Sequence, residues 1–306
     1  MKILVMGAGA VGAYFGARLA AAGEDVTLCA RGKYLEAFRT CGIALKSIRG
    51  DLRLDPVRAT NEPREFAPYD LILFCVKAYD TPEAARAIER CLAKGGAILT
   101  LQNGVENEQQ LAEFFGREAV MGGNARVGVE MVTPGELMHL SSGYIDFGEL
   151  DGRETERARR IAAAFARAGI LGELTPKIRT LRWDKLVWNA AFNSVATLTR
   201  RRVGNIVDDP ESRRLVITLM REIITVARAE GADISFERID SYLAHSDKNL
   251  RAIKTSTQQD LEHGKRLEYE ALSGAVVRAA RRNGVSVPAM ETIYALMRLL
   301  DGARER

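Results

Sequence analysis

Short apolar runs separated by helical stretches dominate the first half of the chain. Runs of this kind are typical of parallel strands buried on both faces of a sheet, and the most apolar of them is Leu71 to Val76. The other expected strands are Met1 to Met6, Asp25 to Ala30, Ala97 to Leu101, Ala119 to Glu130, Glu136 to Phe147 and residues 170–174, with a hairpin over Ile43 to Leu54. Strands that alternate with helices in this way predict a doubly wound α/β domain.

From Thr175-Pro176 onward, helical periodicity replaces the strand pattern. Helices are expected at about 177–199, 210–230, 236–245, 247–263, 268–282 and 288–301. Proline marks the helix starts at Pro210 and Pro288, as it does in the first half at Pro82, where we expect Thr81 to be the N-cap. We therefore predict two domains, an α/β domain of residues 1–176 and an all-α domain of residues 177–306.

A glycine motif stands between the first expected strand and the first expected helix. The residues Gly7, Ala8, Gly9, Ala10, Val11 and Gly12 fit G-x-G-x-x-G in its informative context. Gly7 permits a tight turn, Gly9 leaves room for a pyrophosphate against bare backbone, and Gly12 lets the helix pack closely on the strand. The helix N-terminus also favours phosphate groups. The motif predicts a dinucleotide-binding Rossmann-type domain, and an ordinary glycine-rich turn is the alternative.

The end of the second strand bears on the choice of cofactor. NAD-selective sites place an Asp or Glu about 20 residues after the glycines, where it holds the ribose 2′-hydroxyl. This chain has Arg31 at that place, and the next acidic residue is Glu36. A guanidinium can pair with a 2′-phosphate in fork geometry, so the pattern favours NADP(H). The alternative is an ordinary exposed arginine at the end of a strand.

Four segments of the expected sheet end in residues that could meet a ligand. Gly7, Arg31, Lys77 and Asn103 each follow a strand, and ligands of open α/β sheets bind outside the carboxyl ends of the strands. Taken singly, Lys77 would be a surface lysine and Asn103 part of a plain turn. Their shared placement makes both candidate site residues.

Composition limits the classes of function. The 306 residues are 47% hydrophobic and 27% charged, as expected for a soluble globular protein. The formal net charge of +4 comes from scattered arginines, and the run Arg200 to Arg202 is typical of a helix end, so we expect no nucleic-acid partner.

Several sequence patterns are missing as well. No apolar run approaches the roughly 18 residues of a membrane span, and the N-terminus lacks a secretory pattern. The four cysteines show no C-x-x-C spacing, and the three histidines form no cluster with metal-ligand spacing. We expect a cytoplasmic chain with reduced thiols, no membrane contact and no metal.

The first helix of the second domain carries a polar stripe on an apolar background. Lys185, Asn189 and Asn193 recur every four residues and therefore lie along one face. The rest of this helix is almost wholly apolar, which predicts burial, and buried polar groups must be hydrogen-bonded. Trp183 and Trp188 are expected to be packing residues. The alternative for the stripe is a snorkelling lysine with asparagines that bond neighbouring backbone.

These motifs together resemble the ketopantoate reductase (2-dehydropantoate 2-reductase) family, within the broader 6-phosphogluconate-dehydrogenase-like group. The matching features, in the order of the family, are Gly7 to Gly12, Arg31, Val76-Lys77-Ala78, Gln102-Asn103-Gly104, Trp183-Asp184-Lys185-Leu186 with Asn189 and Asn193, and Ser256 followed by Asp260 and Glu268. They span almost the whole chain. The resemblance implies a Rossmann domain and a helical domain with the active site between them.

The resemblance also implies roles for individual residues. NADPH would deliver hydride to the C2 ketone of a 2-oxo acid, most simply 2-dehydropantoate on the way to pantothenate and coenzyme A, while Lys185 protonates the developing alkoxide. Glu268 would be the acidic residue that orients cofactor and substrate. The implied substrate-binding residues are Asn103, Asn189, Asn193 and Ser256, and the implied cofactor contacts beyond the glycine motif and Arg31 are Lys77, Asn103, Gly128 and Glu268.

Two departures from the family pattern leave the substrate open. Glu270 and Ser273 stand where the family often has Asp and Asn, and the apolar Ile253 stands where an asparagine can bind substrate. A reductase of another 2-oxo or hydroxy acid is therefore an alternative, and a non-catalytic NADPH sensor is a second one. The apolar helical domain could also supply a homodimer contact.

Overall fold

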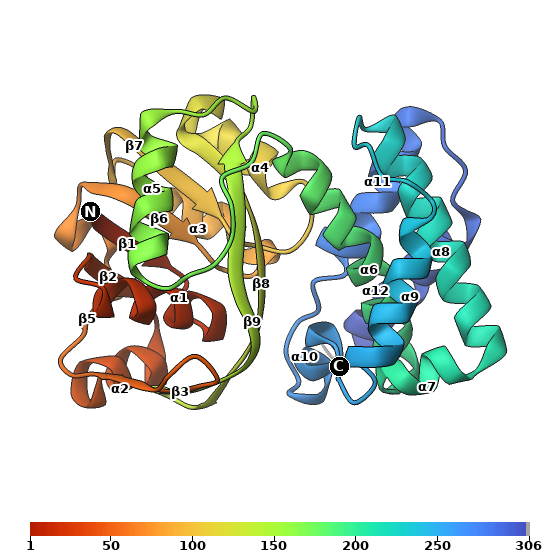
Figure 1. The fold of residues 1–306 in the computed structure, drawn as a ribbon, viewed down its shortest axis with the longest axis horizontal. Helices are drawn as coiled ribbons and strands as arrows, with labels where there is room; N and C mark the ends of the chain where they lie inside the picture. Colours follow the sequence, from red (N-terminus) through yellow and green to blue (C-terminus); the bar gives the residue numbers. More distant parts are fainter. Residues whose placement is uncertain (304–306) are drawn as a thin grey trace. The chain divides into compact units, whose positions relative to one another are not determined.

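The computed structural model describes residues 1–303, and in them the strands form one mixed sheet of order β4-β3-β9-β8-β7-β6-β1-β2-β5 (Figure 1). The strands are β1 Lys2–Met6, β2 Asp25–Cys29, β3 Ile43–Ser47, β4 Leu52–Leu54, β5 Arg58–Thr60, β6 Tyr69–Phe74, β7 Leu92–Thr100, β8 Val120–Thr133 and β9 Glu136–Glu149. Neighbours from β5 to β8 pair in parallel, whereas β8 and β9 form an antiparallel hairpin. The parallel part therefore has all its carboxyl ends on one edge.

Helices cover both faces of this sheet. They are α1 Ala10–Ala21, α2 Gly32–Cys41, α3 Thr81–Ala87, α4 Asn107–Phe115 and α5 Glu156–Arg167, with short 3₁₀ turns between some of them. The alternation along β1 shows the two-sided burial: Ile3 and Val5 join the core that contains residues of α1 and α5, whereas Leu4 joins the core that contains residues of α3 and α4. Burial on both sides explains why β1 and β6 carry continuous apolar runs.

The chain divides into two compact units by its contacts. Unit 1 comprises residues 1–102 and 107–178, and unit 2 comprises residues 179–303 together with Asn103–Glu106. The short segment Asn103–Glu106 follows β7 in the sequence, but its contacts group it with unit 2. No pattern in the sequence predicts this assignment.

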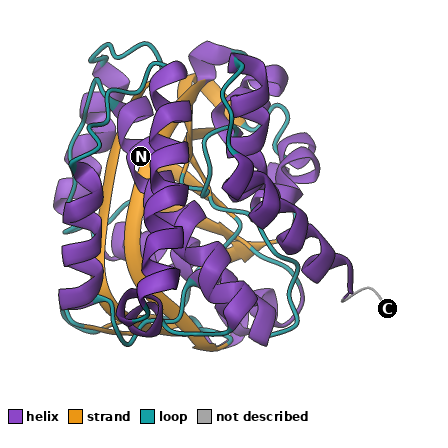
Figure 2. Cartoon of the chain, turned by 90° about the vertical axis from the view of Figure 1, so that its right-hand side faces the viewer, coloured by secondary structure: helices purple, strands orange, loops and turns teal. Residues whose placement is uncertain are grey.

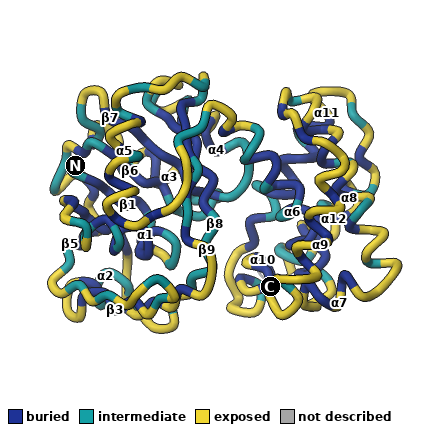
Figure 3. The backbone as a smooth tube through the Cα atoms, viewed as in Figure 1, coloured by how far each residue is buried: buried dark blue, intermediate teal, exposed yellow. Residues whose placement is uncertain are grey.

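Every regular element of the described part of unit 2 is a helix (Figure 2). They are α6 Ile178–Thr199, α7 Val203–Asp208, α8 Pro210–Ala229, α9 Arg238–Asn249, α10 Ser256–Glu262, the π-helix η4 Glu270–Gly274, α11 Ala275–Asn283 and α12 Pro288–Gly302. The helix α6 is buried along most of its length (Figure 3) and supplies much of the hydrophobic core. Its apolar side chains thus explain its place at the centre of unit 2.

Several local expectations were wrong. The break expected between the helices at 236–245 and 247–263 lies further along the chain. The first helix, α9, ends at Asn249, and the second, α10, begins at Ser256, where Thr255 caps it by accepting a hydrogen bond from the Gln258 backbone N–H. The strand expected at 170–174 consists of isolated bridges, and β5 and α7 were not expected at all. Asp80, not Thr81, is the residue that precedes α3, and the Thr81 hydroxyl instead accepts a hydrogen bond from Gln102.

Candidate functional site

The glycine motif forms the turn between β1 and α1. Gly7 has a φ of +93°, and a Cβ there would lie 2.8 Å from the backbone nitrogen of Val76. A Cβ at Gly12 would lie 2.4 Å from the carbonyl oxygen of Gly7. Both positions therefore require glycine because of the packing of the chain itself.

Gly9 differs from the two other glycines of the motif. Its φ of −74° suits any residue, and a Cβ built on it meets nothing within 4 Å. It directly precedes α1, whose first N–H groups have no partner within the helix. The turn thus presents bare backbone and a helix N-terminus to open space, and this arrangement fits the pyrophosphate of a dinucleotide.

The neighbouring strand ends lie beside this turn. The Ala8 N–H donates to the Cys29 carbonyl oxygen at the end of β2, and the Cys75 N–H donates to the Met6 carbonyl oxygen, each at 2.8 Å. The strands β1, β2 and β6 are parallel neighbours (Figure 1), and Arg31 follows β2 while Lys77 follows β6, so both lie on the same edge of the sheet as the glycine turn. The structure thereby brings together the three candidate segments that belong to unit 1.

Arg31 is exposed and paired with acidic side chains of its own chain. Its guanidinium lies 2.9 Å from a carboxylate oxygen of Glu83, in the first turn of α3, and 3.9 Å from one of Asp80. Sequence reasoning missed this pairing because Glu83 is far from Arg31 in the chain. A 2′-phosphate bound by Arg31 would have to compete with Glu83 for the guanidinium.

Gly128 lies within the β8–β9 hairpin. It pairs with Ser141 across the ladder, and a Cβ at Gly128 would lie 2.3 Å from the Ser141 hydroxyl. A larger residue at Gly128 would therefore require the Ser141 side chain to move.

The predicted polar stripe lies on α6. Lys185 and Asn189 are half-buried and Asn193 is buried. The Asn193 amide donates to the Thr257 hydroxyl at 3.4 Å, and Thr257 is the neighbour of the exposed Ser256 at the start of α10. The hydrogen bond of Asn193 thus joins α6 to α10, the two helices that carry the predicted substrate-binding residues Asn189, Asn193 and Ser256.

Other side chains of α6 serve packing, as expected. Trp188 stacks on Phe192 with ring centroids 5.0 Å apart, and its indole N–H donates to the Ser246 hydroxyl at 2.9 Å. Trp183 is buried in the hydrophobic core.

Asp184, the neighbour of Lys185, anchors α6 to α9. Its carboxylate accepts two hydrogen bonds from Arg238, at 3.0 and 3.2 Å, and its backbone carbonyl accepts one from the Tyr242 hydroxyl at 2.6 Å. The hydrogen bond to Asp184 raises the pKa of Arg238, and burial raises the pKa of Tyr242. Both groups therefore keep their protons, and these contacts hold α6 to α9 at the residue next to Lys185.

The segment Asn103–Glu106 brings a further candidate residue to unit 2. The Arg182 guanidinium donates to the Gly104 carbonyl oxygen at 2.5 Å, and a Cβ at Gly104 would lie 2.5 Å from the Ala271 carbonyl oxygen. Lys185 comes one helical turn after Arg182, and the buried Glu268 comes three residues before Ala271. Asn103 is therefore placed near the stretches that carry Lys185 and Glu268.

The residues that depart from the family pattern have identifiable surroundings. The Glu270 carboxylate accepts hydrogen bonds from Arg278 at 2.6 Å and from the Tyr294 hydroxyl at 2.9 Å, and the buried Ser273 hydroxyl donates to the Tyr269 carbonyl oxygen. Ile253 is 38% exposed. Glu270 and Ser273 thus bond other residues of unit 2, whereas Ile253 presents an apolar side chain to solvent.

In residues 1–303, no group of three or more His, Cys, Asp or Glu side chains could hold a metal ion, and no helix is long and apolar enough to cross a membrane.

Comparisons with known proteins agree with this architecture. Residues 3–152 match the family model "Ketopantoate reductase PanE/ApbA", and residues 177–301 match the model of its C-terminal part. The chain is 33% identical over 303 residues to the 2-dehydropantoate 2-reductase of Halobacterium salinarum, and the alignment covers 98% of each chain.

Solved structures show the same fold. A 2-dehydropantoate 2-reductase from Geobacter metallireducens is 36% identical, with a TM-score of 0.93 over 98% of this chain and 99% of that one. A ternary structure of D-mandelate dehydrogenase with NADH and anilino(oxo)acetate also gives a TM-score of 0.93 over 100% of both chains, but at 21% identity this likeness shows the fold alone. A Rossmann-type domain followed by a helical domain is therefore confirmed, and the chain is an oxidoreductase that belongs to the ketopantoate reductase family.

Proposed function

We propose that this chain catalyses the NADPH-dependent reduction of 2-dehydropantoate to (R)-pantoate in pantothenate and coenzyme A biosynthesis. Family membership and full-length relatives named 2-dehydropantoate 2-reductase support the substrate. The packing of Gly104 against Arg182 and Ala271 supports the assignment of residues, because it ties the residue that follows Asn103 to the helix that carries Lys185 and to the turn that follows Glu268.

Lys185 is the proposed general acid. NADPH, when bound, supplies the hydride for C2 of the substrate. The Lys185 ammonium stabilises negative charge on the C2 oxygen and donates a proton to it. Asp184 supports this role by holding α6 against α9 through Arg238.

In this proposal, asparagine amides of α6 and the Ser256 hydroxyl bind the substrate. Asn189, one turn from Lys185, and Ser256, at the start of α10, offer donors and acceptors to a carboxylate and a hydroxyl. Asn193 is the deepest residue of the stripe, and it holds α10 in place through Thr257. Asn103 would contact both cofactor and substrate, and Glu268 would orient them.

NADP(H) is the proposed cofactor, with the glycine turn binding its pyrophosphate and Arg31 its 2′-phosphate. The open space at Gly9 and the position of Arg31 after β2 support this choice. Lys77 lies on the same edge of the sheet and is a further proposed contact, as is the backbone of Gly128. Titration of Arg31→Ala with both cofactors tests the choice: affinity for NADPH should fall much more than affinity for NADH, and an equal loss of both would contradict it.

A steady-state assay with NADPH and a panel of 2-oxo acids tests the substrate. We expect 2-dehydropantoate to give the highest kcat/KM. The exposed apolar Ile253 favours one alternative, a less polar 2-oxo acid, and preference for such a substrate would replace 2-dehydropantoate while keeping the reductase. Binding of NADPH without turnover of any substrate would instead indicate a sensor. The proposal further includes a cytoplasmic location and a homodimer, the latter to be tested by light scattering.

A further inference from the structure

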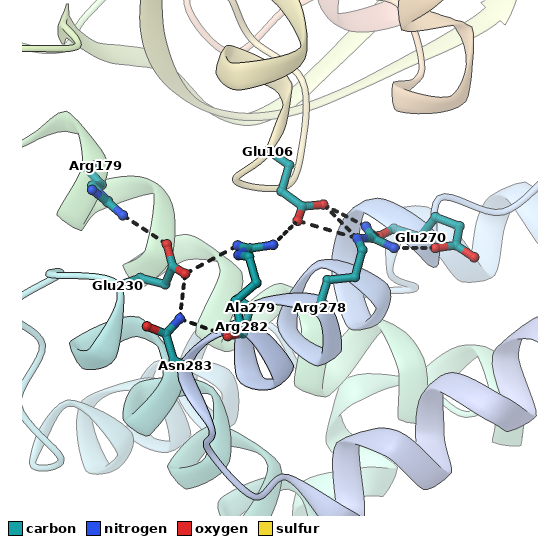
Figure 4. Close-up of polar contacts among 8 residues, drawn as sticks. All are labelled: Glu106, Arg179, Glu230, Glu270, Arg278, Ala279, Arg282 and Asn283. Atoms are coloured by element: carbon teal, nitrogen blue, oxygen red, sulfur yellow. Dashed lines mark hydrogen bonds and ion pairs between the residues drawn. The ribbon is translucent and has the colours of Figure 1, made fainter.

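The carboxylate of Glu106, at the end of the segment Asn103–Glu106, is held by two arginines of α11 (Figure 4). Arg278 donates to it from Nη2 at 2.7 Å and from Nε at 3.1 Å, and Arg282 donates from Nη1 at 3.2 Å. The Glu106 side chain is only 18% exposed. Two hydrogen bonds from one guanidinium to a largely buried carboxylate fix its geometry more strongly than an exposed ion pair does.

Arg278 also binds the π-helix that follows Glu268. Its Nη1 donates to the Glu270 carboxylate at 2.6 Å, and its Nη2 donates to the Glu270 carbonyl oxygen at 2.6 Å. The Tyr294 hydroxyl of α12 donates to the other oxygen of the same carboxylate at 2.9 Å. One guanidinium therefore joins the segment that contains Asn103 to the helical turn that follows Glu268.

The segment needs such a support because it has no regular structure of its own. Gly104 adopts a φ of +98°. Contacts of Gly104 with Arg182 and Ala271 and the packing of Val105 on the core also hold the segment to unit 2. Loss of the Glu106 contacts would free backbone rotations next to Asn103, and ordering them again costs conformational entropy.

We propose that Arg278 is a positioning residue, which holds Asn103 and Glu268 in their working arrangement through Glu106 and Glu270; this inference rests on the proposed function of those two residues. It also gives Glu270 a role, because its carboxylate is the bridge between Arg278 and the π-helix. Arg278 itself acts only through its neighbours.

The test compares Arg278→Met with a matched control on the same helix. Arg281→Met removes an arginine that pairs with Glu291 instead, at 3.3 Å, so it should leave activity unchanged. Because small displacements of binding groups can cost up to a hundredfold in rate, Arg278→Met should lower kcat/KM for 2-dehydropantoate by roughly tenfold to a hundredfold. Arg278→Lys keeps the positive charge but loses the planar guanidinium, so its kcat/KM should lie between those of Arg278→Met and the wild type.

A double variant separates positioning from general stability. Because Arg278 acts partly through Asn103 in this proposal, Arg278→Met should lower kcat/KM by a smaller factor in the Asn103→Ala background than in the wild type. Hydrogen–deuterium exchange of the peptide that covers residues 103–106 should be faster in Arg278→Met than in the wild type. Glu106→Gln should show a smaller loss of kcat/KM and a smaller rise in the exchange rate of this peptide. It replaces Arg278→Met in these measurements if Arg278→Met does not fold.

The outcomes are distinct. Unchanged exchange of this peptide, or losses of Asn103→Ala and Arg278→Met that multiply, would overturn the proposal. Faster exchange in a protein that does not reduce 2-dehydropantoate would reject the substrate assignment and keep the role of Arg278 in holding the segment.

Discussion

Replacing Gly9 by alanine should weaken nucleotide binding without unfolding the protein. The Cβ of the new side chain would meet nothing within 4 Å, and the φ of −74° suits alanine. Two small effects on stability oppose each other: alanine restricts the unfolded chain, which stabilises by about 0.4–1 kcal/mol, and it is a poorer N-cap than glycine by a similar amount. The free energy of unfolding should therefore change by less than about 0.5 kcal/mol, which shifts Tm by no more than about 1–2 °C.

The effect on NADPH affinity should be much larger. The added methyl group would occupy the open space in which a pyrophosphate approaches the backbone N–H groups of the turn. Losing one hydrogen bond to a charged group costs about 1.5–3 kcal/mol, which corresponds to a roughly tenfold to hundredfold rise in Kd. Titration of the protein with NADPH measures the Kd, and thermal unfolding of the same samples measures Tm.

Two other glycine substitutions serve as controls, which separate an effect on nucleotide binding from an effect on stability. At Gly302 a Cβ also meets nothing within 4 Å, and the position lies in α12 of unit 2, so Gly302→Ala should change neither Kd nor function. At Gly12 the Cβ would lie 2.4 Å from the Gly7 carbonyl oxygen, so Gly12→Ala should lower stability by about 1–3 kcal/mol. If Gly9→Ala bound NADPH as well as the wild type does, the glycine turn would not be the nucleotide site.

Two further changes test other parts of the structure. Glu83→Gln removes the carboxylate that pairs with Arg31. The Kd for NADPH should therefore fall severalfold while the Kd for NADH stays constant. Unchanged NADPH binding would mean that this exposed ion pair does not compete with the cofactor. Burial lowers the pKa of His139 below its ordinary value of 6.5. As pH falls below about 6.5, the unfolded chain therefore takes up a proton at this residue that the folded chain does not. The free energy of unfolding should then fall by at most about 1.4 kcal/mol per pH unit. His139→Gln should lose less stability than the wild type between about pH 7 and pH 5.5 in denaturant titrations, and equal losses would assign the pH dependence to other groups.

Local patterns were sufficient to predict most of the architecture. Apolar runs predicted the buried strands because both faces of the sheet are covered, as the alternation of Ile3, Leu4 and Val5 between two cores shows. The break between α9 and α10 also had a signal that was overlooked, since Thr255 and Gln258 are spaced as in a capping box. The three-residue strand β5 is too short to give a pattern.

The candidate site was only partly predictable for a different reason. The glycine turn and the stripe on α6 are local, so spacing along the chain was enough to propose them. The pairing of Arg31 with Glu83 and the attachment of Asn103–Glu106 to α11 join residues far apart in sequence. Such contacts depend on tertiary packing, which no single-sequence pattern encodes.

The most direct test of the account is the kcat of Lys185→Ala with NADPH and 2-dehydropantoate at saturating concentrations. As the proposed general acid, Lys185 should contribute about a hundredfold to ten-thousandfold, so kcat should fall by that factor while the Kd for NADPH changes little. A variant that reduces 2-dehydropantoate at the rate of the wild type would contradict the proposed mechanism.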